Sequence, residues 1–107
     1  MSKSGLSIAV VCLMVVACKK NSPEQLAALQ SAADAYCTCA RSALADTPRE
    51  RAAMVAARAR CEALSPALDA ARAQLAVPVG QDPAARAITD LQKACYTSLT
   101  NSIPMGK

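Results

Sequence analysis

Proline stands directly after a helix-capping residue at four places in this chain of 107 residues, and the pattern predicts where its helices begin. A capping side chain accepts a hydrogen bond from a backbone N–H in the first turn of the helix. Proline has no backbone N–H, and it fits the first helical position because an N–H there would find no acceptor within the helix. Gln25 and Glu50 stand where each would complete a capping box. The four steps are Ser22-Pro23, Thr47-Pro48, Ser65-Pro66 and Asp82-Pro83.

Apolar residues recur at intervals of three and four behind these starts, which is the spacing of one face of an α-helix. The pattern predicts helices over residues 23–45, from about residue 48 onward, and over about 83–101. The second stripe keeps its phase beyond Pro66, so this helix is expected to be kinked or broken there into nearly collinear pieces. The side chains expected to point inward are Leu26, Leu29, Ala33, Tyr36, Cys37, Ala40, Leu44, Met54, Ala57, Cys61, Leu64, Leu68, Ala71, Leu75, Ile88, Leu91, Cys95 and Leu99.

Helical segments joined by short connections predict an all-α fold, a small antiparallel three-helix bundle. Its core is expected to be thin. Hydrophobic residues make up 53% of the chain, but alanine supplies many of them, and Tyr36 and Tyr96 are the only aromatic residues. Each alanine buries little area. A domain this small is therefore expected to be cross-linked by disulfides.

A basic and then apolar leader ends at Cys18. Lys3 supplies the positive charge, residues 6–16 form an apolar run too short to span a bilayer, and the small Ala17 directly precedes Cys18. This order of elements resembles the signal peptide of bacterial lipoproteins, which is cut before a cysteine that then carries acyl chains. Cys12 does not fit the pattern, because a bulky valine precedes it.

The resemblance implies how the chain is organised and where it resides. It implies a signal peptide over 1–17 and a lipidated cysteine with a short tether over 18–22. The helix pattern predicts a helical bundle domain over 23–102 and a tail over 103–107. It implies a lipid bilayer as a partner, bound through acylated Cys18. In bacterial lipoproteins, an aspartate directly after the lipidated cysteine retains the protein at the inner membrane. This chain has Lys19 at that position, so it resembles lipoproteins that are sorted to the outer membrane and face the periplasm. The tether is so short that the bundle is expected to lie against the membrane.

Four further cysteines fall within the predicted bundle, at Cys37, Cys39, Cys61 and Cys95. An exported chain meets an oxidising compartment, where an even set of cysteines indicates disulfides. Side chains two residues apart on a helix diverge by about 200°, so Cys37 and Cys39 are not expected to pair with each other. One is expected to bond Cys61 and the other Cys95. Similar heights along the bundle leave both arrangements open.

A metal site is the competing hypothesis for these cysteines. Zinc motifs usually present two cysteines on a turn, separated by two to four residues, whereas Cys37 and Cys39 diverge on a helix. The chain contains no histidine to complete a mixed site, and it lacks the C-x-x-C motif of redox-active pairs. We therefore expect structural disulfides, no metal and no cofactor.

Charged residues in the predicted bundle form no recognisable catalytic or nucleic-acid-binding pattern. Without histidine the commonest general base is missing, so no enzyme activity is expected. The net charge of +4 is dispersed and aromatic residues are scarce, so no nucleic-acid partner is expected. Caps and solvated helix faces are the expected roles of Asp46, Glu50, Glu62, Asp69, Asp90, Arg58, Arg60, Arg72 and Arg86.

The sequence thus predicts a membrane-tethered periplasmic lipoprotein without catalytic activity. Its expected role is that of an envelope structural or adaptor protein, which presents a helical surface to an unknown protein partner. One alternative is a membrane-active, toxin-like small lipoprotein whose helices perturb lipid. The other is an envelope protein that binds a soft metal through its thiols.

Overall fold

The computed structural model describes residues 20–105, and the predicted signal peptide and Cys18 lie outside them. The described chain forms helices α2 (Pro23–Asp46), α3 (Arg51–Glu62), α4 (Ser65–Ala73), the short 3-10 helix η2 (Val79–Gln81) and α5 (Pro83–Asn101). Residues 20–105 contain no strand, which confirms the all-helical prediction.

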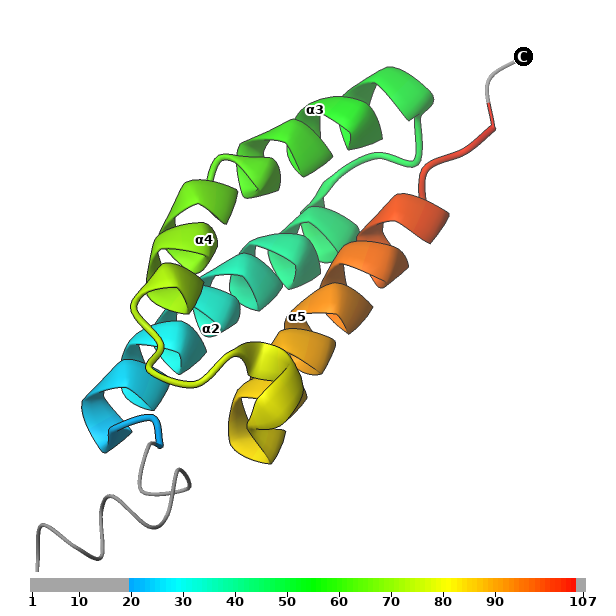
Figure 1. The fold of residues 1–107 in the computed structure, drawn as a ribbon. Coiled ribbons are helices and arrows are strands. Elements are labelled where there is room, and N and C mark those ends of the chain that lie inside the picture. The colour runs from blue at the N-terminus through cyan, green and yellow to red at the C-terminus, as the bar shows by residue number, and fades with distance from the viewer. Residues whose placement is uncertain (1–19, 106–107) are drawn as a thin grey trace, which may run out of the picture.

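Helix α2 packs against the other long helices. Figure 1 shows α3 followed by α4 on one side of α2 and α5 on another, so that α2 contacts all three. The short connection after α2 and the longer one between α4 and α5 lie at opposite ends of the molecule. α2 therefore carries the residues that can link all the helices together.

The first and last predicted helix starts are confirmed. Ser22 Oγ accepts a hydrogen bond from the Gln25 N–H at 3.0 Å, and Gln25 Oε1 accepts one from the Ser22 N–H at 2.8 Å, which completes the capping box of α2. At α5, Asp82 Oδ1 accepts a hydrogen bond from the Ala84 N–H at 3.0 Å. Each side chain satisfies a helix N–H that has no partner within its own helix.

The predicted capping box at Thr47 and Glu50 is wrong, because α3 begins at Arg51 rather than at Pro48. Thr47 instead ends α2, and its N–H donates to the Ala43 carbonyl at 3.1 Å. The Glu50 N–H donates to the Pro48 carbonyl at 2.8 Å, and the Glu50 side chain caps nothing. Residues 47–49 reverse the chain, and Glu50 then starts α3 through its backbone alone, since its carbonyl accepts from the Met54 N–H at 2.9 Å.

The expected interruption of the second helix is present, slightly before Pro66. Ala63 and Leu64 keep helix-like backbone angles, and the Leu64 N–H donates to the Cys61 carbonyl at 3.0 Å, in a tighter turn than that of an α-helix. In an unbroken helix the Pro66 ring would clash with the carbonyl four residues earlier, at Glu62. The chain therefore ends α3 at Glu62 and starts α4 at Ser65.

The core is thin and rich in alanine. Its fully buried large side chains are Tyr36, Leu29, Met54, Leu68 and Leu99, and between them lie buried alanines at 33, 40, 57 and 85. A side chain as small as alanine lets helix axes approach closely, which suits direct covalent links between helices.

One residue expected in the core is exposed. Leu91 is 49% exposed, while Thr89 and Gln92 of the same helix are buried. Cys95 is half-buried at the edge of the buried stripe of α5, and Leu91, one turn earlier, lies about 40° farther round the helix. A stripe centred on Ala85, Gln92 and Leu99 leaves Leu91 outside.

Candidate functional site

The two cysteines of α2 form disulfides to two different helices. Cys37 bonds Cys95 of α5, with the Cα atoms 5.3 Å apart, and Cys39 bonds Cys61 of α3, with the Cα atoms 5.6 Å apart. This is one of the two arrangements that the sequence left open. Because side chains at these two positions diverge around α2, each reaches only one neighbour.

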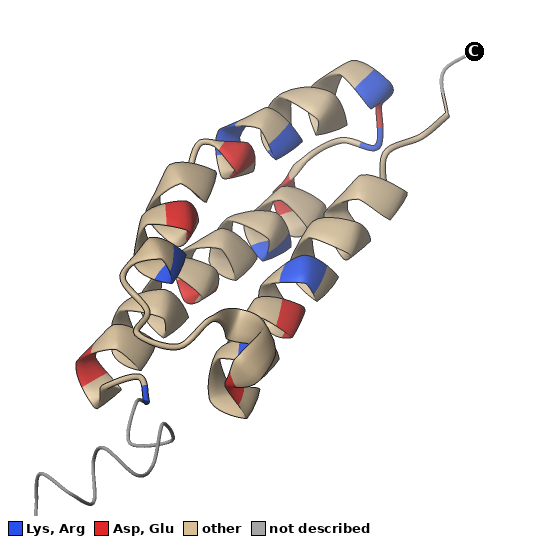
Figure 2. Ribbon diagram, in the orientation of Figure 1, with Lys and Arg blue, Asp and Glu red and all other residues tan. Residues whose placement is uncertain are grey.

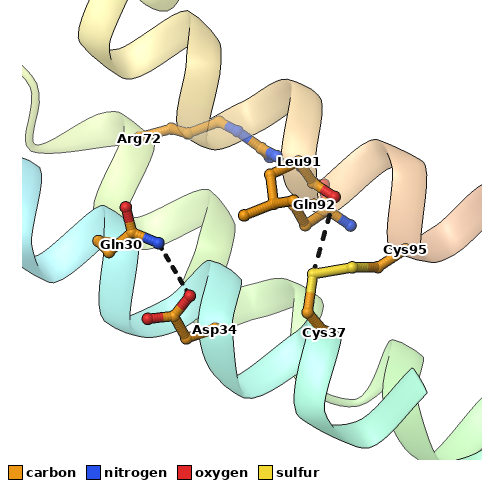
Figure 3. The surroundings of a disulfide bond; sticks show 7 residues. All are labelled: Gln30, Asp34, Cys37, Arg72, Leu91, Gln92 and Cys95. Atoms are coloured by element: carbon orange, nitrogen blue, oxygen red, sulfur yellow. Dashed lines mark hydrogen bonds between the residues drawn. A yellow bond between two sulfur atoms is a disulfide. The ribbon is translucent and has the colours of Figure 1, made fainter. Parts of the chain in front are cut away.

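The bond between Cys37 and Cys95 lies beside the backbone of α5 (Figure 3). Cys37 is buried, and its sulfur lies 3.7 Å from the Leu91 carbonyl oxygen. A sulfur in a disulfide carries no hydrogen to donate. The contact is therefore packing of the sulfur against the helix, and it fixes the position of α5 along α2.

A polar contact joins α4 to α5 near this disulfide. Arg72 Nη2 donates to Gln92 Oε1 at 3.3 Å, and both side chains are drawn in Figure 3. Arg72 Nη1 also forms an ion pair with Asp69 Oδ1 at 3.1 Å. Gln92 is buried although it is polar. Arg72, expected on a solvated face, is half-buried and satisfies this buried amide oxygen.

Tyr36 and Glu62 form a second buried polar contact, at the break between α3 and α4. The Tyr36 hydroxyl donates to Glu62 Oε2 at 2.9 Å, and the Ser65 hydroxyl donates to Glu62 Oε1 at 3.3 Å. Burial of the phenol, and next the hydrogen bond to Glu62, raise the pKa of Tyr36 well above its usual value. Glu62, expected on a solvated face, thus holds α2, α3 and α4 together.

Asn21 is the residue that sequence reasoning missed. It lies directly before the cap of α2, is only 7% exposed, and reaches the loop between α4 and α5. Its Nδ2 donates to the Val77 carbonyl at 3.1 Å and to Asp82 Oδ2 at 2.5 Å, while its Oδ1 accepts from the Val77 N–H at 2.9 Å. An asparagine before a helix is a common residue in a common place, so no sequence pattern marked it.

Asp82 links this contact to the start of α5. The hydrogen bond from the Asn21 amide holds the pKa of the Asp82 carboxyl below its usual value. Partial burial raises this pKa, and the N–H groups of Ala84 and Ala85 lower it further. The carboxylate therefore accepts hydrogen bonds from both the Asn21 side chain and the helix it caps. We call the contact among Asn21, Val77 and Asp82 the tether clamp.

Two shallow hollows flank the disulfides. One, of about 230 Å³, lies between α2 and α3 and is lined by Cys39, Ser42, Ala43, Asp46, Thr47, Ala57 and Arg60. The other, of about 220 Å³, lies between α2 and α5 and is lined by Ala40, Arg41, Leu44, Ala94, Cys95 and Ser98. Both are smaller than typical small-molecule pockets.

Cys18, the predicted lipidation site, lies outside the described residues. Within residues 20–105, no group of three or more metal-ligating side chains lies close together. None of the helices in this range is long and apolar enough to cross a membrane. No family model, curated protein or solved structure matches the chain.

Proposed function

We propose that the chain is a lipid-anchored protein of the bacterial envelope, attached through acylated Cys18 on the periplasmic side of the outer membrane. Its helical domain presents a surface to a protein partner and catalyses no reaction. The leader that ends at Ala17-Cys18 carries the anchoring part of this proposal. The tether clamp supports it, because Asn21 would hold the domain close to the anchored cysteine.

The domain is proposed to be an antiparallel three-helix bundle in which α3 and α4 together form the middle arm. The connections after α2 and after α4 lie at opposite ends of the molecule, which supports this arrangement. Two disulfides join α2 to both neighbours, which suits a domain that must keep its shape in the oxidising periplasm with little apolar core.

Intact mass spectrometry of the protein extracted from membranes tests the anchoring. We expect a species that begins at Cys18 and carries added acyl mass. Alkylation before reduction should add nothing to the other four cysteines, and alkylation after reduction should modify all of them. Retained leader residues would contradict the lipoprotein assignment, and four freely alkylated thiols would favour the metal-binding alternative.

Photo-crosslinking tests for a protein partner. Val55 on α3 and Leu91 and Tyr96 on α5 are exposed apolar positions, where a photoreactive residue leaves the core untouched. We expect one discrete cross-linked protein in membranes from at least one of these positions. Crosslinks to lipid alone from all three would contradict the adaptor role. Ala27, exposed on α2, provides a matched control on another face.

Dye release from liposomes separates the anchored adaptor from the membrane-active alternative. A domain whose helices bury their apolar faces against each other has little apolar surface to insert into lipid. We therefore expect the unlipidated protein to release no dye above the level of a buffer control. Release that rises with protein concentration would favour the membrane-active alternative.

A further inference from the structure

The two ends of the helical domain have the same net charge but differ in how their charged residues are placed. We call residues 20–24 and 75–86 the tether end, and residues 46–51 and 103–105 the distal end. The loop from Leu75 to Gln81 at the tether end contains no charged residue, whereas Arg49, Glu50 and Arg51 follow one another at the distal end (Figure 2). Arg51 also donates to the Pro104 carbonyl at 3.1 Å, so the described part of the tail lies at the distal end.

The tether clamp fixes where the chain enters the tether end. Asn21 bonds both backbone groups of Val77 and one oxygen of Asp82, so the chain cannot swing away from the loop without breaking three hydrogen bonds. Only two residues separate Cys18 from Asn21. Even fully extended, this stretch holds the Cα atom of Cys18 within about 11 Å of that of Asn21.

We propose that the tether end rests on the surface of the phospholipid bilayer, so that α2 points away from the membrane. This inference rests on the proposed function, because it requires acyl chains on Cys18. The surface offered to lipid includes the uncharged loop from Leu75 to Gln81. The exposed uncharged residues of the tether end are Pro23, Ala76, Pro78, Gly80, Gln81, Pro83 and Ala84.

The charged side chains at the tether end suit the headgroup layer. Lys20 and Arg86 are exposed there, where a cation can contact lipid phosphates, and Glu24 is the exposed acidic residue on the same end. Asp82 is already engaged by Asn21 and Ala84. The distal end, with its exposed charges, would face the periplasm. Since α2 has 24 residues, that end would stand about 36 Å from the membrane.

Spin labels at the two ends test this orientation. Gly80→Cys is suited to the tether end, because an added Cβ meets no atom within 4 Å and Gly80 has no positive φ. Glu50→Cys is the matched label at the distal end, since Glu50 is exposed and caps nothing. Each full-length lipidated variant is labelled without reduction and placed in vesicles of phosphatidylcholine and phosphatidylglycerol.

The measurement is the collision rate of each label with oxygen, which concentrates in lipid, relative to a water-soluble nickel complex. We expect this ratio to be several-fold higher for the Gly80 label than for the Glu50 label. Equal ratios at the two ends would overturn the orientation, whether both labels are in water or both are at the membrane. Ala76→Cys, exposed in the same loop, repeats the test if Gly80→Cys fails to form both disulfides.

Mass spectrometry of the same samples separates a failure of orientation from a failure of anchoring. Equal collision ratios in a protein with acyl mass on Cys18 would overturn only the orientation and leave the proposed lipoprotein intact. Absence of acyl mass would overturn both, because the tether would then hold the domain to nothing.

Discussion

Asn21 and Val77 are 56 residues apart in sequence, yet the side chain of one accepts from the backbone N–H and donates to the backbone carbonyl of the other. An asparagine side chain has the same donor and acceptor groups as a peptide unit, so it pairs with an otherwise unpaired residue as a neighbouring strand would. The loop between α4 and α5 thereby satisfies backbone groups that no helix uses.

Replacing Asn21 with alanine should therefore destabilise the domain. The change removes three hydrogen bonds and leaves both polar groups of Val77 without this partner, so we expect the free energy of unfolding to fall by roughly 2–3 kcal/mol. Urea denaturation followed by circular dichroism measures the loss. Lys20→Ala is the matched control, because the Lys20 side chain is exposed. Equal midpoints for the two variants would contradict the role of the clamp.

Asp82 should make part of the stability depend on acid pH. Its pKa is lowered in the folded protein, chiefly by Asn21, so its contribution is fully present above the unfolded pKa of about 3.9 and is lost as the pH falls through the folded value. We expect wild type to be more stable than Asp82→Asn at neutral pH, with the difference shrinking below about pH 4. Urea midpoints across this range test it, and a difference independent of pH would refute it.

Tyr36 should act at the opposite end of the pH scale. Its pKa is raised by burial and by Glu62, so folding favours the neutral phenol, and its contribution is present below the unfolded pKa of about 10 and lost as the pH rises above it. Wild type should therefore lose stability above about pH 10 more steeply than Tyr36→Phe does. Thermal melts between neutral and alkaline pH provide the comparison. Parallel curves for the two proteins would show that ionisation of Tyr36 does not destabilise the folded protein.

The two disulfides should contribute unequally. Cys37–Cys95 spans 58 residues and Cys39–Cys61 spans 22, and a longer loop restricts the unfolded chain more. The chain-entropy relation gives about 4 kcal/mol for the first and about 3 kcal/mol for the second. We expect the Cys37→Ser, Cys95→Ser double variant to unfold at a lower urea concentration than Cys39→Ser, Cys61→Ser. The reverse order would mean that packing around α3 outweighs loop closure.

The buried alanines should tolerate little added volume. Ala33 is fully buried between helices, so Ala33→Leu must push them apart and should cost roughly 1–3 kcal/mol. Ala27→Leu, at an exposed position of the same helix, should leave the unfolding midpoint nearly unchanged. Both variants are compared by urea denaturation. A stable Ala33→Leu would indicate a loosely packed core.

Local signals predicted the parts of this fold that depend on neighbouring residues. Ser22 and Asp82 cap the helices that follow them because a capping bond spans only two or three residues. Thr47 carries the same signal, yet the preceding helix uses its backbone first. A capping motif takes account only of the residues that follow the cap, so it does not detect that the preceding helix already uses the same residue.

The remaining contacts depend on distances that arise only when the helices pack. The pairing of the cysteines depends on which neighbouring helix lies on which side of α2. The sequence left this open, because the four cysteines are at similar heights along the bundle. Glu62 and Arg72 have the sequence context of solvated charges, and their partners Tyr36 and Gln92 come from other helices. Asn21 finds its partner 56 residues away.

The position of Cys37 also sets how the molecule yields to mechanical force. A pull on the chain before Asn21 would break the clamp and then unwind α2 from its first turn. Unwinding stops at Cys37, because there a disulfide joins α2 to Cys95 of α5, and two residues later another joins it to Cys61 of α3. The 19 residue steps from Cys18 to Cys37 extend to roughly 65 Å. The domain thus has a short segment that can extend, and the two disulfides limit further unwinding of α2 from that end.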